Sequence, residues 1–365
     1  MTATSPSASI PASSAPAGYK PLQIGDVAIG FPVVQAALSG YSDGPMRRIA
    51  RRLGAPYTLC EVLLDEFVIT AGKGTRKMMK VAEEEHPVAG QLMGALPENF
   101  PPAALRLIKE GFDVVDINFG CPVKKVLGRC RGGFHLSQPT VALEIVKRVR
   151  DALPPKIPVT VKMRRGIDDT DEARDKFFEI FEGAFALGAA AITVHGRTVK
   201  QRYIGPSNWN FLREVKRLAG DRVILGSGDL FTAQACLDMI EQTGVDGVTA
   251  ARGAIGNPWI FREARALAAG QPLPDPPSLF EQREVILEHY RLAEELWGAD
   301  RCGRMMRKFG IKYAQLHPEP LLVRDAFIRV KNLAEWQAVL TEHYSTDLPG
   351  RRPPAADDIG ECGCD

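Results

Sequence analysis

The sequence has no apolar run that approaches the roughly 18 residues needed for a membrane-spanning helix, and we expect no contact with a membrane. The first residues, MTATSPSASIPASSAPAG, have neither a basic start nor an apolar core, so a signal peptide is not predicted. They are rich in Ser, Ala and Pro, which is typical of disordered segments. We therefore expect a disordered tail at residues 1–19.

Cysteine is also scarce. The chain of 365 residues has seven cysteines, and their spacing does not indicate a framework of disulfide bonds. Free cysteines are typical of the reducing cytoplasm, where we expect the protein to reside. The C-terminal ECGCD offers two soft ligands on a segment that we expect to be disordered, residues 345–365. Two such ligands are too few for a defined site, so no metal site is predicted.

Short apolar runs alternate with amphipathic stretches of helical period along most of the chain. The runs lie at 31–38, 57–64, 87–94, 114–120, 158–164, 190–196, 222–228 and 246–253. Eight such strand–helix units predict a (β/α)₈ TIM barrel, which we place at residues 20–272. An open doubly wound sheet is the alternative, but no GxGxxG motif follows the first predicted strand.

The pattern changes after the proline-rich stretch QPLPDPPS at 271–278. Residues 279–344 contain only helical periods, for example EQREVILEHYRLAEELWG. We therefore predict an appended C-terminal α-helical bundle over 279–344.

Polar residues follow successive predicted strands at their carboxyl ends, which is where barrel enzymes carry their active sites. They are Gln91, Asn118, Cys121, Lys162, Arg164, His195, Arg197, Ser227, Asp229, Arg252 and Gly253. Each one alone could have a packing role, but their common position at one end of the barrel favours a site. The last two strands are followed by the glycine-rich turns GSGDL and AARGAIGNP, which favour a ligand that carries a phosphate.

Several motifs of this chain occur together in one known family. They are QAALSGYSDGPMRR, GQLMG, DINFGCPVKKV, VKMRRG, VHGRTVKQRYIGPSNW, GSGDL and ARGAIGNPWIF. With them, residues 22–344 resemble the tRNA-dihydrouridine synthases. The resemblance implies an FMN-binding catalytic barrel, a helical RNA-binding domain, tRNA as the partner and NADPH as the co-substrate. No stable protein partner is predicted.

The resemblance also implies roles for individual residues. Cys121 matches the proton donor of the family: reduced FMN gives a hydride to carbon 6 of uracil, and the thiol gives a proton to carbon 5. An apolar pocket would keep that thiol protonated at neutral pH, as general acid catalysis requires. The residues implied to bind FMN are Ala37, Leu38, Ser39, Gln91, Asn118, Lys162, His195, Ser227, Gly228, Asp229, Ala251 and Arg252.

Affinity for RNA comes mostly from contacts with phosphates, so lysines and arginines are candidates for that role. The net charge of +2 by itself neither requires nor excludes such a partner. In the barrel the candidates are Lys124, Lys125, Arg129, Arg131, Arg164, Arg197, Lys200 and Arg202. In the helical domain they are Arg304, Arg307, Lys308, Lys312, Arg324, Arg329 and Lys331, for which a merely solvated face is the alternative.

The chain departs from the family in a few places. Ala37-Leu38 stand where Pro-Met is usual, Ser227 replaces Asn, and Ala251 replaces Gly. The segment GRCRGGFHLSQP at 128–139 replaces a run of small residues, and we expect Arg129, Arg131 and His135 to make it bulkier and more basic. Three alternatives stay open: an rRNA substrate, a small-molecule FMN barrel of the dihydroorotate or dihydropyrimidine dehydrogenase type, and a non-catalytic RNA-binding protein.

Overall fold

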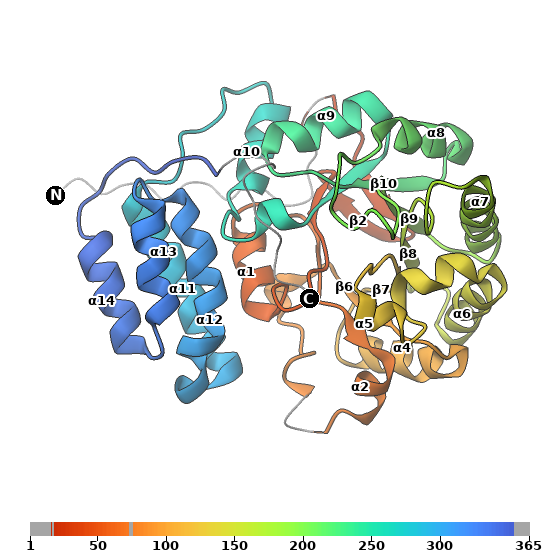
Figure 1. The fold of residues 1–365 in the computed structure, drawn as a ribbon, viewed down its shortest axis with the longest axis horizontal. Helices are drawn as coiled ribbons and strands as arrows, with labels where there is room; N and C mark the ends of the chain where they lie inside the picture. Colours follow the sequence, from red (N-terminus) through yellow and green to blue (C-terminus); the bar gives the residue numbers. More distant parts are fainter. Residues whose placement is uncertain (1–15, 17, 73–75, 354–365) are drawn as a thin grey trace.

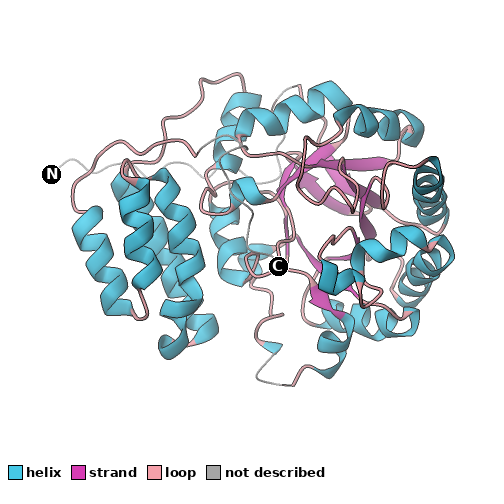
Figure 2. Ribbon diagram, in the orientation of Figure 1, coloured by secondary structure: helices cyan, strands magenta, loops and turns pink. Residues whose placement is uncertain are grey.

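The computed structural model describes residues 16, 18–72 and 76–353, and within them a closed barrel of parallel strands carries helices on its outside (Figures 1 and 2). The barrel strands pair in sequence order, and β11 pairs with β3 to close the ring. The predicted TIM barrel is therefore confirmed. Its strands are β3 (Val33–Gln35), β4 (Thr58–Leu59), β6 (Val88–Met93), β7 (Val114–Phe119), β8 (Val159–Arg164), β9 (Ala191–His195), β10 (Val223–Ser227) and β11 (Gly247–Ala250).

The outer layer consists of helices that follow the strands. They are α1 (Gly44–Arg52), α2 (Asp65–Thr70), α4 (Phe100–Lys109), α5 (Lys124–Leu127), α6 (Pro139–Ala152), α7 (Asp171–Ala186), α8 (Trp209–Ala219), α9 (Ala233–Thr243) and α10 (Ile260–Ala268). Short 3₁₀ turns are η1 (Glu83–Glu85), η2 (Pro97–Asn99), η3 (Gly132–Ser137), η4 (Arg252–Ala254) and η5 (Ala314–Leu316). Local signals start several helices: the side chains of Thr170 and Thr232 accept a backbone hydrogen bond at the N-termini of α7 and α9.

Every residue of β6 and β7 is buried, because one face of these strands packs on the helices and the other fills the barrel. The predicted strand 57–64 is instead two short pieces, β4 and β5 (Leu63–Leu64). The ladder to β6 is interrupted at Cys60, whose sulfur takes the hydrogen bond from the backbone N–H of Gln91 at 3.3 Å. A backbone carbonyl would accept that bond in a continuous strand.

A hairpin that we did not predict precedes the barrel. Its strands are β1 (Leu22–Ile24) and β2 (Val27–Gly30). Leu22, Ile24 and Ile29 are buried and pack in one cluster with Ala191 and Leu225 from the inside of the barrel. The hairpin therefore covers the amino-terminal end of the barrel.

The C-terminal region is helical, as predicted. It contains α11 (Leu279–Trp297), α12 (Ala299–Tyr313), α13 (Pro320–Arg329) and α14 (Leu333–His343), which lie beside α1 on one side of the barrel (Figure 1). Trp259 of the barrel donates to Glu281 at 2.7 Å, and the rings of Tyr41 and Phe309 meet edge to face at 5.5 Å. No helix in the described part of the chain combines the length and apolarity required to cross a membrane.

The first part of the expected C-terminal tail is fixed to the fold. The backbone carbonyl of Leu348 accepts from the N–H of Leu279 at 2.9 Å, so it satisfies a free donor at the start of α11. The Arg352 guanidinium binds Glu263 at 3.0 Å. Residues 345–353 thus differ from the predicted disorder, because they supply partners that a helix start and a buried carboxylate need. Residues 354–365, and the expected N-terminal tail except for residues 16, 18 and 19, lie outside the described residues.

Candidate active site

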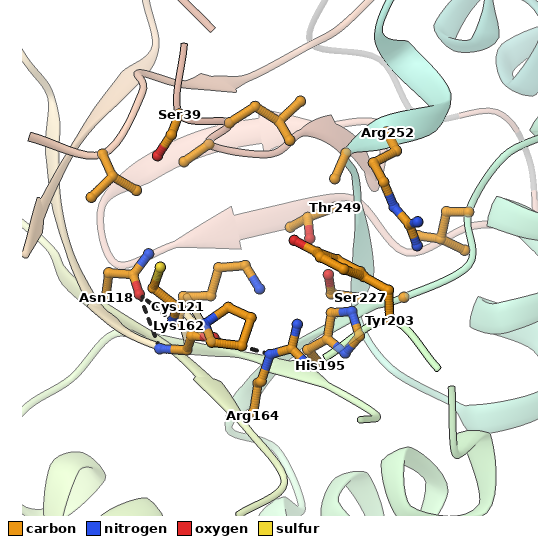
Figure 3. Close-up of a pocket in the computed structure, with 18 of the residues that line it drawn as sticks. Ser39, Asn118, Cys121, Lys162, Arg164, His195, Tyr203, Ser227, Thr249 and Arg252 are labelled. Carbon is orange, nitrogen blue, oxygen red and sulfur yellow. Dashed lines mark hydrogen bonds between the residues drawn. The ribbon is translucent and has the colours of Figure 1, made fainter. Parts of the chain in front are cut away.

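A pocket opens at the carboxyl ends of the barrel strands (Figure 3). Neighbouring strands hold its polar side chains in register. Asn118 of β7 aligns with Lys162 of β8. One step higher, His195 of β9 aligns with both Arg164 of β8 and Ser227 of β10. Because residues two apart on a strand share a face, Lys162 and Arg164 both point into the barrel mouth. The sequence-predicted clustering of these residues is therefore found in the structure.

The segment that carries Cys121 is held from two sides. The side-chain oxygen of Asn118 accepts the backbone N–H groups of Gly120 and Cys121, both at 3.0 Å (Figure 3). From the other side, the N–H of Gly133 donates to the Cys121 carbonyl at 3.0 Å. A Cβ on Gly132, whose φ is +59°, would lie 2.8 Å from the Cβ of Cys121, so only glycine fits there. The cysteine therefore has a fixed backbone.

The Cys121 side chain lines the pocket and is not part of the apolar core. Burial raises the pKa of this thiol, and the nearby Arg164 and Lys162 only partly oppose that effect. A raised pKa keeps the sulfur protonated at neutral pH. The residue can thus act as a proton donor toward a molecule in the pocket.

Two cations stand next to this thiol. Burial, with a further effect from Arg164, lowers the pKa of Lys162 to about 8. No hydrogen-bond partner for the Lys162 ammonium occurs among the described residues, and it faces the open space of the pocket (Figure 3). Arg164 is instead fixed by the carbonyls of Gly120, Thr198 and Arg202, at 3.0, 2.8 and 2.7 Å. Burial lowers the pKa of Arg164 to about 10, so it stays charged at neutral pH.

His195 is a neutral hydrogen-bond donor. Its Nδ1 accepts the backbone N–H of Arg197 at 3.1 Å, which assigns the ring proton to Nε2. Burial is the main cause that lowers the pKa of His195 well below its ordinary value, and the surrounding cations Arg164 and Lys162 add to it. The ring therefore adds a donor to the pocket without adding charge.

The turn after β10 is built around Asp229, which adopts a φ of +60°. Its carboxylate accepts the N–H of Ser207 at 2.7 Å and the guanidinium of Arg197 at 2.9 Å. Gly228 has a φ of +118°, and a Cβ there would collide with Ser207. The guanidinium of Arg252 lies 3.6 Å from Asp229. These contacts fix the backbone of the turn that we expected to meet a phosphate.

Of the twelve predicted FMN-binding residues, Gln91 alone is missing from the pocket wall. Its side chain is fully buried one layer below, where it bonds to Asn118 and Asp116. The other predicted residues that line the pocket are Ala37, Leu38, Ser39, Asn118, Lys162, His195, Ser227, Gly228, Asp229, Ala251 and Arg252.

Sequence reasoning missed several pocket residues that lie on loops or between polar positions. They are Tyr41, Val62, Tyr203, Phe231, Thr249 and Ile255. Arg252 lies over the rings of Tyr203 and Phe231, at 4.6 and 4.8 Å from their centroids. Tyr203 lies inside the VHGRTVKQRYIGPSNW motif, and this motif was the sequence signal that could have placed it in the pocket.

Several predicted RNA-binding cations are not on the surface. Arg164 and Arg197 are buried, and Arg131 is 8% exposed and bonds to Glu66 at 2.9 Å. Lys308 donates to the carbonyl of Gly40. The three arginines therefore have internal partners that a surface phosphate would have to replace, whereas Lys308 is half-buried and makes its bond at the surface. The candidates with exposed positions are Lys124, Lys125, Arg129, Lys200, Arg304, Arg324, Arg329 and Lys331.

The unusual segment 128–139 is less basic toward solvent than we expected. His135 is buried and its Nε2 bonds to the Gly94 carbonyl at 3.0 Å, with its ring 5.2 Å from that of Phe119. With Arg131 also internal, Arg129 is the exposed cation of this segment. The main role of the segment 128–139 in the structure is to support the backbone of Cys121.

Comparison with known proteins gives the family. The model of the dihydrouridine synthase (Dus) family matches residues 34–348. A probable tRNA-dihydrouridine synthase from Mycobacterium tuberculosis is 34% identical over 328 residues, which cover 87% of this chain and 84% of that protein. The tRNA-dihydrouridine synthase B of Xanthomonas axonopodis pv. citri is 31% identical over 338 residues, 92% of this chain and 99% of that one.

Among solved structures, a morphinone reductase superposes with a TM-score of 0.53 at 17% identity, over 72% of this chain and 92% of that chain. That likeness concerns the barrel fold. The match of the family model and the relatives at this identity and coverage lead to one conclusion: this chain belongs to the dihydrouridine synthase family.

Proposed function

We propose that the protein reduces uridines of tRNA to 5,6-dihydrouridine, with FMN bound in the barrel pocket and NADPH as the source of electrons. One observation carries the proposal: a protonated cysteine faces a cation-lined pocket in a chain that belongs to the dihydrouridine synthase family. The names of these relatives, which are tRNA-dihydrouridine synthases, support tRNA as the substrate class.

The donor set of the pocket fits FMN. The Lys162 ammonium faces the cavity, and the buried hydroxyl of Thr249 has no hydrogen-bond partner among the described residues. Arg252 and the backbone around Gly228 suit a phosphate, and Leu38 and Ile255 supply apolar walls for a flat ring. When bound and reduced, FMN supplies the hydride that carbon 6 of the uracil receives.

The residues of the chain supply the rest of the reaction. Cys121 holds the proton that carbon 5 takes. The electron pair at carbon 5 forms the new C–H bond, the S–H pair stays on sulfur as a thiolate, and the thiolate then regains a proton from water. Lys162 and Arg164 stabilise negative charge in the pocket, and neutral His195 can donate to a ring oxygen or nitrogen. Carbon 6 gains hydride and carbon 5 gains a proton, so the C5–C6 double bond is reduced.

A uracil in folded RNA must leave its stack to reach this pocket. Exposed cations near the mouth support RNA as the partner. Lys124 and Lys125 begin α5 three and four residues after Cys121, and both are exposed. In the described part of the chain the five cysteines are free, which supports a reducing compartment such as the cytoplasm.

The test is a Cys121→Ala variant, with Cys130→Ala as the matched control on the exposed part of the same segment. We expect Cys121→Ala to bind FMN and accept electrons from NADPH, yet to lose uridine reduction by about 10²- to 10⁴-fold, the usual contribution of a general acid. The control should retain the normal rate. Normal uridine reduction by Cys121→Ala would overturn the assignment.

The substrate itself is tested by mapping dihydrouridine in the RNA of cells that lack this gene. Loss of dihydrouridine from tRNA supports the proposal. Loss from rRNA alone, with tRNA unchanged, would replace tRNA by rRNA as the substrate.

A further inference from the structure

A chain of buried hydrogen bonds runs from the middle of the barrel to Cys121. The Thr160 hydroxyl donates to one oxygen of Asp116 at 2.5 Å, and the Gln91 amide donates to the other at 2.6 Å. The Asn118 amide donates to the Gln91 oxygen at 2.8 Å. The Asn118 oxygen then accepts the backbone N–H of Cys121 at 3.0 Å.

The lower part of this chain is sealed inside the barrel. Asp116 is 1% exposed and Gln91 is 0% exposed. Gln91 of β6 aligns with Asp116 of β7, and Asp116 aligns with Thr160 of β8. Buried polar groups need partners, and solvent cannot supply them at this depth. The hydrogen bonds of one residue in this layer therefore determine those of the next.

The direction of the chain is set at its two ends. The carboxylate of Asp116 is an acceptor, so the NH₂ group of Gln91 must face it and the Gln91 oxygen must face Asn118. At the other end, the backbone N–H groups of Gly120 and Cys121 are donors, so the Asn118 oxygen must face them. Both requirements give the same orientation of both amides. Burial raises the pKa of Asp116, and the two donors and the nearby Lys162 act against that effect.

We propose that Asp116 is a positioning residue: it sets the orientation of Gln91 and Asn118, and through them the place of the Cys121 thiol over the substrate. Asp116 does not line the pocket, so it acts through its neighbours. The proposal rests on the proposed function for its effect on the reaction. Its effect on the thiol itself can be measured without substrate or flavin.

The experiment compares Asp116→Leu, which removes the acceptor, with Asp116→Asn, which keeps an oxygen for Gln91 because the Thr160 hydroxyl can turn to accept the new NH₂. In the full-length protein without flavin, the rate at which iodoacetamide alkylates Cys121 is followed by site-resolved mass spectrometry. We expect Asp116→Leu to raise that rate several-fold, and Asp116→Asn to restore the rate of the original protein.

With FMN bound, uridine reduction by Asp116→Leu should fall on the order of 100-fold through kcat, since a misplaced catalytic group costs that much, while KM for RNA stays the same. Thr160→Val is the matched control, because it removes a partner of Asp116 that is not on the path to Cys121. Gln91→Met cuts the path at a second point and decides the matter if Asp116→Leu does not fold.

The proposal would be overturned if Asp116→Leu and Gln91→Met fold but leave the alkylation rate and kcat unchanged. It would also be overturned if Thr160→Val lowered kcat as much as they do. If instead the alkylation rates change as expected but no variant, nor the original protein, reduces uridine, then the positioning role stands and the proposed function fails.

Discussion

Lys162 gives the pocket a charge that depends on pH near neutrality. It is enclosed by the barrel with Asp116, Cys121 and Arg164 as its charged or titratable neighbours. The barrel provides no counter-ion in hydrogen-bond contact among the described residues, so a bound anion would be its first direct partner. The pKa of about 8 follows from burial and from the like charge of Arg164.

This predicts the pH dependence of FMN binding. The lowered pKa means that Lys162 is charged below about pH 8 and loses its charge as the pH rises through that value. FMN affinity should fall about tenfold between pH 7 and 9.5, because a hydrogen bond to a charged group contributes ~1.5 kcal/mol or more. The phosphate of FMN, with a second pKa of about 6, does not titrate in this range.

Flavin fluorescence titration of the apoprotein measures the effect. It is made in a Cys121→Ser background, so that the thiol does not add its own titration. Lys162→Met should bind FMN weakly at every pH with a flat profile. The same slope in Lys162→Met as in its parent would show that another group is responsible.

At the scale of elements, the segment between β3 and α1 connects the pocket with the helical domain. Leu38, Ser39 and Tyr41 line the pocket, and the Tyr41 ring packs against Phe309 of α12. The ammonium of Lys308 donates to the Gly40 carbonyl and lies 5.4 Å from the centre of the Tyr41 ring. Helix α12 therefore holds one wall of the pocket.

The contact predicts that Lys308→Met weakens FMN binding although Lys308 lies outside the pocket. The dissociation constant should rise roughly threefold or more, since a hydrogen bond from a charged donor is lost. Arg304→Met is the matched control, one turn away on α12 and exposed. It should leave FMN binding unchanged in the same fluorescence titration. If Lys308→Met lowered RNA affinity alone, Lys308 would be the phosphate contact that the sequence suggested.

The elements that the sequence predicted well are those defined by burial along the chain. Strands such as β7 and β8 are apolar runs between helical periods, so their order and the barrel follow. The split at Cys60 and the hairpin at Leu22–Gly30 escaped prediction, because one depends on a contact with Gln91 and the other on packing into the finished barrel.

The sequence predicted which polar residues at the strand ends form the candidate site. It predicted less well which cations are exposed. Charged residues are usually exposed, so the sequence placed Arg131 and Arg197 on the surface. Their partners Glu66 and Asp229 are 65 and 32 residues away along the chain, a pairing that no local pattern encodes. The resemblance to the family predicted that Gln91 lines the pocket. In the structure it lies one layer below, where it bonds to Asp116 and Asn118.

For the whole molecule, the position of exposed charge matters more than the small net charge. Arg329 and Lys331 are exposed at the end of α13, and Gly303 packs against the backbone of Lys331 and Asn332, which brings Arg304 to the same end of the helical domain. Helix α6 lies on the opposite side of the barrel (Figure 1). The two surfaces allow a comparison of matched charge changes.

The Arg329→Glu/Lys331→Glu variant should bind tRNA more weakly and with less dependence on salt. Each lost phosphate contact should lower the slope of log K against log salt by about 0.7 to 0.9. Lys147→Glu/Arg148→Glu, on the exposed face of α6, is the control with the same charge change and should alter neither quantity. Filter binding of tRNA at several salt concentrations measures both. Equal losses in the control and the test variant would mean that net charge alone governs binding.

The hairpin β1–β2 closes the amino-terminal end of the barrel, so among the described residues the barrel opens at the carboxyl ends of its strands. Under the proposed function, the nicotinamide donor and the extruded base would both enter through that one opening. We then expect the donor to leave before the base enters, so that the two halves of the catalytic cycle are separate in time.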